Sequence, residues 1–207
     1  MAQYLQIHAV NPQERLISQA AAVVRAGGVI VYPTDSCYAL GALSTDKGAV
    51  ERIIRIRRLA AKHNMTLICR DLTDIGVYAK LDNTAFRFIK SLTPGPYTFL
   101  LKASRDVPRR LQHPQRKTIG LRVPDNRIAL ALLESLGEPL LSTSLILPGR
   151  ELPETEPAEI RQLLQTQVEL VINGGAGGHV PTTVLDLTAG SPTIVRTGKG
   201  DISQIVI

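Results

Sequence analysis

The stretch from Gly27 to Gly41, GGVIVYPTDSCYALG, constrains the fold of this chain more than any other segment. Two glycines precede a run that favours a buried strand, Val29 to Tyr32, and Pro33 then breaks that strand. The polar turn Thr34-Asp35-Ser36 follows at once. Ligands of open α/β sheets sit at such strand ends, but these residue types are also ordinary turn formers. Taken by itself, the stretch favours a plain strand and turn over a binding site.

Helix and strand patterns alternate through the first half of the chain, whereas strands cluster near its end. Asn11 and Pro12 predict the N-cap and first position of a helix that stops at Gly27, and Asp46 ends a second capping sequence. The further predicted helices are Asp71–Tyr78, Asn83–Leu92, Arg127–Leu136 and Ala158–Gln165. The predicted strands are Met65–Arg70, Tyr97–Lys102, Thr118–Pro124, Val168–Asn173, Thr183–Leu187 and Thr193–Arg196. A further apolar segment is Leu140–Leu147. No linker or repeat interrupts this order, so it predicts one α/β domain, residues 1–207, built on a mixed sheet.

The core of this domain is expected to be mainly aliphatic. Hydrophobic residues make up 44% of the chain, but aromatic residues only 4%, and there is no Trp. Two of the predicted helices offer the core residues Ala49, Val50, Ile53 and Ile54, and Phe86, Phe88 and Ile89. Few rings are left to stack on bases, which weighs against a single-strand nucleic-acid binder with aromatic platforms.

The formal net charge of +6 favours an anionic partner, either the phosphates of a nucleotide or those of RNA or DNA. Cys37 and Cys69 fit neither a disulfide nor a metal-ligand pattern, and with four histidines no metal centre is expected. The N-terminal segment lacks the signal-peptide pattern, and no apolar run approaches the length of a membrane span. We therefore expect a cytoplasmic protein that does not bind membranes.

Several familiar catalytic and nucleotide-binding motifs are missing, among them GxxxxGK[ST], GxGxxG, HExxH and GxSxG. What remains is a distributed set of hydroxyl and guanidinium groups at predicted strand and helix ends: Thr34, Ser36, Arg55, Arg57, Thr118, Arg122, Ser142, Ser144, Thr182 and Arg196. Arginine presents a planar fork that fits phosphate or carboxylate. If these groups converge on one concavity they form an anion site without a P-loop, but sequence spacing leaves that convergence open.

Seven short motifs, spread over most of the chain, resemble those of the YrdC-like family of L-threonylcarbamoyl-AMP synthases. PTDSCYALG resembles the PTDTxYGLG stretch of that family, and Arg55-Ile56-Arg57 sits where the family has K-x-R. The later matches, in the same order as in the family, are Pro94–Thr98 (P-G-P-x-T), Gly120–Pro124 (G-x-R-x-P), Ser142–Ser144 (start of S-x-N), Pro181–Val184 (P-S-T-V) and Val195–Gly198 (L-R-x-G). The stretch His63–Cys69 is similar to the YciO-type branch of this family.

The resemblance implies a single twisted α/β domain with a large, basic concave face. It also implies a reaction of L-threonine, bicarbonate and ATP, with Mg²⁺ as helper, that gives threonylcarbamoyl-AMP and pyrophosphate for tRNA modification. By position, Thr34, Asp35, Tyr38, Thr118 and Arg122 would belong to the threonine side. The nucleotide side would comprise Arg55, Arg57, Ser142, Ser144, Thr182 and Arg196, and no protein nucleophile would be needed.

Two departures from the family motifs fall in the nucleotide half. Arg55 replaces the Lys of K-x-R, and Ile146 stands where S-x-N has Asn. Loss of one polar contact made in the transition state costs about 2–4 kcal/mol, so the resemblance implies a weakened synthase. Two alternatives stay open. One is a protein that binds double-stranded RNA or tRNA through Arg55, Arg57, Arg58, Lys62 and Arg122, and the other is a relative that acts on a different nucleotide or amino acid.

Overall fold

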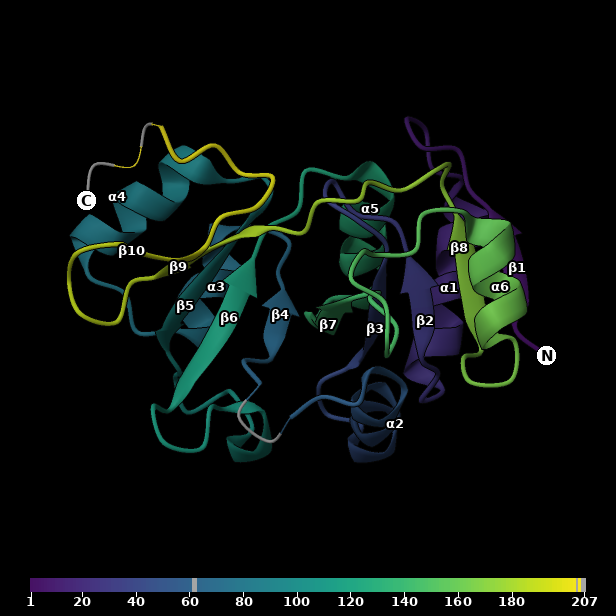
Figure 1. Ribbon diagram of the computed structural model, residues 1–207, viewed down its shortest axis with the longest axis horizontal. Coiled ribbons are helices and arrows are strands. Elements are labelled where there is room, and N and C mark those ends of the chain that lie inside the picture. The colour runs from purple at the N-terminus through teal and green to yellow at the C-terminus, as the bar shows by residue number, and fades with distance from the viewer. Residues whose placement is uncertain (61–62, 204, 206–207) are drawn as a thin grey trace.

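A computed structural model of the chain describes residues 1–60, 63–203 and 205. Ten strands form one sheet in these ranges, accompanied by six α-helices and one short 3-10 helix (Figure 1). The predicted class, α/β with a single mixed sheet, is confirmed. No helix in the described ranges combines the length and the apolarity that crossing a bilayer requires.

The sheet runs in the order β1-β8-β2-β3-β7-β4-β6-β5-β9-β10. Its strands are β1 (Gln3–Gln6), β2 (Ile30–Tyr32), β3 (Ala39–Leu43), β4 (Thr66–Ile68), β5 (Tyr97–Lys102), β6 (Thr118–Arg122), β7 (Leu140–Ser144), β8 (Leu170–Asn173), β9 (Thr183–Asp186) and β10 (Thr193–Arg196). The helices are α1 (Glu14–Arg25), α2 (Lys47–Arg57), α3 (Leu72–Tyr78), α4 (Asn83–Leu92), η1 (Arg109–Leu111), α5 (Arg127–Leu136) and α6 (Pro157–Leu164). Four neighbouring pairs are parallel (β1–β8, β8–β2, β4–β6 and β5–β9), and the remaining pairs are antiparallel.

The helices lie along the whole length of this sheet. Figure 1 shows α1 and α6 at the end of the sheet that holds β1 and β8, and α4 at the opposite end. Alternate strand residues pack into two apolar clusters, because successive side chains of a strand point to opposite faces. Around β2, for instance, Val31 and the preceding Val29 join one cluster while Ile30 and Tyr32 join the other, which also contains residues of α1 and α5.

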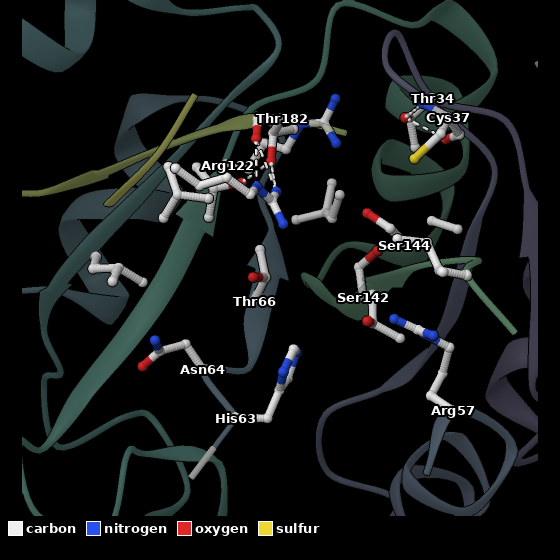
Figure 2. A pocket seen from close by; sticks show the side chains of 18 of the residues that line it. Thr34, Cys37, Arg57, His63, Asn64, Thr66, Arg122, Ser142, Ser144 and Thr182 are labelled. Carbon is white, nitrogen blue, oxygen red and sulfur yellow. Dashed lines mark hydrogen bonds between the residues drawn. The ribbon is translucent and has the colours of Figure 1, made fainter. Parts of the chain in front are cut away.

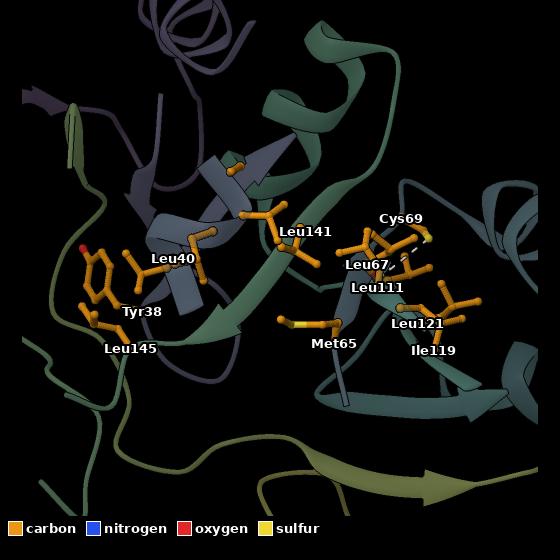
Figure 3. Close-up of a cluster of buried hydrophobic side chains, with 14 of the residues drawn as sticks. Tyr38, Leu40, Met65, Leu67, Cys69, Leu111, Ile119, Leu121, Leu141 and Leu145 are labelled. Atoms are coloured by element: carbon orange, nitrogen blue, oxygen red, sulfur yellow. Dashed lines mark hydrogen bonds between the residues drawn. The ribbon is translucent and has the colours of Figure 1, made fainter. Parts of the chain in front are cut away.

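The larger cluster continues through the middle of the sheet, where Leu40, Leu141, Leu67 and Leu121 come from neighbouring strands (Figure 3). All four are fully buried. Cys69 belongs to the same cluster, and its burial raises the pKa of the thiol well above the usual range. Cys69 is therefore an inert core residue.

Most predicted helix boundaries are confirmed, with one correction at α1. Asp46 caps α2 by accepting a bond from the amide of Ala49 at 2.8 Å, and α4 and α5 span the predicted residues. Asn11 does not cap α1, which begins at Glu14 after Gln13. The amide of Asn11 instead donates to His8 Nδ1 at 3.0 Å, which holds this segment in a loop.

Two strands and two core assignments were wrong or missing in the sequence-based prediction. Strand β1 buries only Leu5, and β3 combines small residues with Leu40 and Leu43 shortly after the predicted turn. Helix α2 buries Ile56 and leaves Ile54 half-buried, because its apolar stripe follows the helical period. Phe86 is 40% exposed on α4 and does not reach the core, whereas Ile89 does.

Candidate functional site

A cavity of about 420 Å³ lies against the sheet, within the range of about 300–1,000 Å³ that is typical of ligand sites (Figure 2). Seven consecutive strands of the sheet, from β3 across to β10, each contribute to its wall. The lining residues are Thr34, Cys37, Ala39, Arg57, His63, Asn64, Thr66, Ile68, Thr98, Leu100, Arg122, Ser142, Thr143, Ser144, Ile146, Thr182, Val184, Val195 and Arg196. Sequence spacing left the convergence of the ten hydroxyl and guanidinium residues open. In the structure seven of the ten line one cavity, whereas Ser36, Arg55 and Thr118 do not.

Strand geometry explains much of this polar wall. On β4 and β5 every second side chain faces the cavity, so Thr66 and Ile68, and Thr98 and Leu100, line it. The residues between them pack in the core. Ser142 is held by a 2.7 Å hydrogen bond with the hydroxyl of Tyr32, whose burial raises its pKa to about 12 and keeps it neutral.

The turn after β2 places Thr34 and Cys37 at the cavity. The hydroxyl of Thr34 donates to the carbonyl of Cys37 at 2.7 Å and accepts from the amides of Ser36 and Cys37 at 3.2 and 3.3 Å. This side chain therefore fixes the turn as well as facing the cavity.

Arg122, at the end of β6, forms an ion pair with Asp35 from the same turn. Both side chains are buried, at 6% and 9% exposure. Asp35 does not line the cavity and reaches it only through Arg122. Nε of Arg122 and Oδ2 of Asp35 are buried and lack hydrogen-bond partners among the described residues.

Two further arginines line the cavity, Arg196 from strand β10 and Arg57 from helix α2. Arg196 donates to the carbonyl of Thr182 at 2.8 and 3.1 Å and to its hydroxyl at 3.2 Å, and that hydroxyl shares a 2.9 Å bond with Thr98. Arg57, at the end of α2, has a buried Nε without a partner in the described part of the chain. Burial lowers the pKa of both guanidinium groups, which nonetheless stay charged at neutral pH. The cavity is therefore cationic.

Besides Asp35, three more predicted site residues do not line the cavity. Tyr38 is fully buried, and its hydroxyl donates to the carbonyl of Gly175 at 2.6 Å. Thr118 is buried at the start of β6, four residues before Arg122, and does not line the cavity. Arg55 is exposed on α2 and does not line it either. Lys62, part of the predicted basic surface, lies outside the described residues.

The prediction also missed several lining residues, chiefly His63, Asn64, Thr66 and Thr98. A signal for His63, Asn64 and Thr66 was present, because all three belong to the stretch His63–Cys69, which contains β4. Burial lowers the pKa of His63, and the positive charges of Arg57 and Arg196 lower it further.

The described residues hold no group of three or more His, Cys, Asp or Glu side chains arranged to ligate a metal. The lining residues in these ranges also contain no carboxylate, the ligand type on which protein-bound Mg²⁺ depends. The cavity wall thus does not fit a Mg²⁺ ion held by the protein itself.

Known proteins are similar to this chain in sequence and in fold. The family model described as "Telomere recombination", the Sua5/YciO/YrdC domain, matches residues 22–198. YciO of Escherichia coli K12 is 59% identical over 206 residues, covering all of both chains, and its crystal structure superposes with a TM-score of 0.97.

Two relatives are more distant. The threonylcarbamoyl-AMP synthase of Chromobacterium violaceum is 36% identical over 181 residues, which is 86% of this chain and 92% of that protein. The structure of Pyrococcus abyssi Sua5 complexed with L-threonine is 29% identical with a TM-score of 0.86, and the match covers 94% of this chain and 57% of Sua5. The chain belongs to the Sua5/YciO/YrdC family.

Proposed function

We propose that this protein joins L-threonine, bicarbonate and ATP into threonylcarbamoyl-AMP, with release of pyrophosphate. Relatives at 30–36% identity carry the name threonylcarbamoyl-AMP synthase, and a Sua5 structure contains L-threonine. The observation that carries the proposal is the convergence of Arg57, Arg122 and Arg196 on one cavity whose described wall contains no carboxylate. Such a site favours a ligand with several negative charges.

The three arginines divide the cavity in a way that suits two anionic substrates. Arg122 is held by Asp35, so its position is fixed, while its buried Nε still lacks a partner within the described residues. A substrate carboxylate bound there would satisfy that N–H. Arg57 and Arg196 have no carboxylate partner in the described ranges and are the candidates for binding phosphate oxygens.

The reaction then proceeds by positioning and charge compensation. The carbamate oxygen of carboxylated threonine attacks the α-phosphorus of ATP, the bond from that phosphorus to the bridging oxygen breaks, and pyrophosphate leaves with its electron pair. Fixed guanidinium and hydroxyl groups lower the energy of this transition state because charge builds up on the phosphate oxygens. Ser142, Ser144 and Thr182 supply hydroxyl groups to the cavity for this purpose.

Ile146 lines the same cavity and offers no hydrogen bond. We infer a slow synthase on this ground. The test is to incubate the full chain with threonine, bicarbonate and ATP and to measure both pyrophosphate and threonylcarbamoyl-AMP. Release of both in equal amounts, dependent on threonine and bicarbonate, supports the proposal. A folded protein that produces neither at saturating substrate overturns it.

A second candidate function is binding of double-stranded RNA or tRNA. Arg55 and Arg58 are exposed at the end of α2, next to the cavity residue Arg57, and so could contact a phosphate backbone. The affinity for a tRNA should then fall steeply as the salt concentration rises. Arg55→Gln should reduce by about one the slope of the logarithm of the association constant against the logarithm of the salt concentration. An affinity that is indifferent to salt contradicts this function.

A further inference from the structure

One step of the proposed reaction has no group assigned to it. The amine of an amino acid is protonated at neutral pH, and it cannot attack the carbon of bicarbonate until it loses a proton. A carboxylate would be the usual acceptor in such a cationic site, but none lines the described part of the cavity. The acceptor must therefore be another lining side chain or water.

Among the described lining residues, His63 and Cys37 have side chains of a type that acts as a general base. The guanidinium groups of Arg57, Arg122 and Arg196 offer no proton acceptor. Cys37 is buried within the turn after β2, and its sulfur lies 3.9 Å from the hydroxyl of Ser36, which donates to it. This leaves His63 as the accessible acceptor.

The position of His63 suits proton transfer. It lies three residues before the first residue of β4, Thr66, and lines the cavity together with it. Figure 2 shows its imidazole projecting from the chain toward the Thr66 side of the cavity, with Arg57 on the opposite wall. The residue as a whole remains exposed, so a proton taken from a ligand can pass on to water.

We propose that His63 is the general base that takes a proton from the amine of the amino-acid substrate, within the synthase function proposed above. In this step the ammonium N–H bond breaks and the proton binds the imidazole. The amine nitrogen then forms a bond to the carbon of bicarbonate, one C–O bond of bicarbonate breaks, and water leaves with a second amine proton. The sum is R–NH₃⁺ + HCO₃⁻ + His63 giving R–NH–COO⁻ + H₂O + His63–H⁺, in which atoms and charge balance.

The surroundings of His63 keep it in the form that this role requires. Loss of water around the imidazole lowers its pKa, and the positive charges of Arg57 from α2 and Arg196 from β10 lower it further. The neutral imidazole therefore persists below the usual histidine pKa of about 6.5. Once protonated beside two cations, His63 releases its proton readily, either to solvent or to the anionic product.

The test compares the natural protein, His63→Gln and a control, His179→Gln, which changes an exposed histidine outside the cavity. Formation of threonylcarbamoyl-AMP is measured from pH 6 to 10. We expect His63→Gln to be about 100-fold slower or more at pH 7, a typical loss for a general base. The deficit should shrink at alkaline pH because the substrate amine then loses its proton without help, and His179→Gln should match the natural protein.

A second measurement distinguishes a role of His63 as general base from a structural or phosphate-binding role. Threonylcarbamoyl-AMP and pyrophosphate are supplied and the ATP formed in the reverse reaction is measured. His63→Gln should form ATP at close to the natural rate, because this half of the reaction moves no amine proton. Equal slowing of both directions, or a deficit that is constant with pH, overturns the role of His63. If the natural protein is inactive in both directions, the synthase function and this proposal are both overturned. If the natural protein is active and His63→Gln matches it at every pH, only the proposal for His63 is overturned.

Discussion

Arg122 at the end of β6 donates to the carboxylate of Asp35, 87 residues earlier in the chain, and this buried ion pair fixes the turn after β2 against the opposite half of the sheet. The turn is held from a second side, because Nζ of Lys199 donates to the carbonyl of Asp35. The threonine side of the proposed site thus depends on contacts between three distant segments.

Removing Asp35 should destabilise the protein strongly. Asp35→Ala leaves the buried charge of Arg122 without its partner, and loss of one member of a buried pair costs about 3–5 kcal/mol. The measurement is the free energy of unfolding from urea denaturation. Glu51→Gln is the control, since it breaks the exposed pair with Lys47 and should cost less than about 1 kcal/mol. A loss for Asp35→Ala as small as that of the control contradicts the importance of the pair.

Arg57 and Arg55 should differ sharply in their effect on activity. Arg57→Gln removes a cavity guanidinium, and a hydrogen bond to a charged group contributes about 1.5–3 kcal/mol, so product formation should fall roughly 10- to 150-fold. Arg55→Gln changes an exposed residue outside the cavity and should leave the rate within about twofold of the natural one. Similar losses for both variants would show that the ligand extends beyond the cavity.

Ile146→Asn should raise the synthase rate. The new amide faces the cavity and can contact charge that develops in the transition state, a contact that elsewhere contributes about 2–4 kcal/mol. We expect an increase of about tenfold or more in initial rate. Leu152→Asn makes a comparable change at a residue that is 60% exposed outside the cavity, and it should have no effect. An unchanged rate in Ile146→Asn would place the ligand away from this wall.

Gly198 should tolerate no side chain. A Cβ at this position would lie 2.3 Å from the carbonyl oxygen of Pro181, so Gly198→Ala must displace the segment that carries Arg196. Overpacking of this kind costs about 1–3 kcal/mol, and thermal unfolding measures it. Gly76→Ala is the opposite case, since its Cβ meets nothing within 4 Å inside α3, and should stabilise by about 0.5–1 kcal/mol. Equal effects of the two substitutions would contradict the packing at Gly198.

The pair of Arg70 and Asp74 should make part of the stability depend on pH. Hydrogen bonds from Arg70, at 2.8 and 2.9 Å, hold the pKa of Asp74 below its usual range. This contribution is complete above the unfolded-state pKa of about 3.9 and is lost as the pH falls through the lower folded-state pKa. The difference in unfolding free energy between the natural protein and Asp74→Asn should therefore shrink below about pH 4. Arg70→Gln should show the same trend, and a difference that stays constant down to acid denaturation would contradict it.

The sequence predicted much of the fold because capping residues and apolar periods are local. It predicted less well which residues line the cavity, because the direction in which a side chain points depends on where its helix or strand lies in the fold. Residues 55 and 57 differ by about 200° around a helix, so only one of the two arginines can reach the cavity. Cys37, in the turn after β2, lines the cavity, whereas the next residue, Tyr38, packs in the core.

His63 and Asn64 show a different limit. They come just before a strand of only three residues, and their place beside Ser142 follows from the pairing of β4 with β7, which lies far away in the sequence. No local pattern encodes that pairing. Cavity residues contributed by the neighbour of a short strand can therefore be found only once the strand order is known.

The positions of the wall residues along the chain also determine when the cavity wall can be complete during synthesis. Thr182, Val184, Val195 and Arg196 form the last part of the wall and belong to β9 and β10 or their approach, at the far edge of the sheet. A ribosome makes these residues after it has made every strand from β1 to β8. A nascent chain that ends before β9 therefore lacks part of the wall that would surround its anionic ligand.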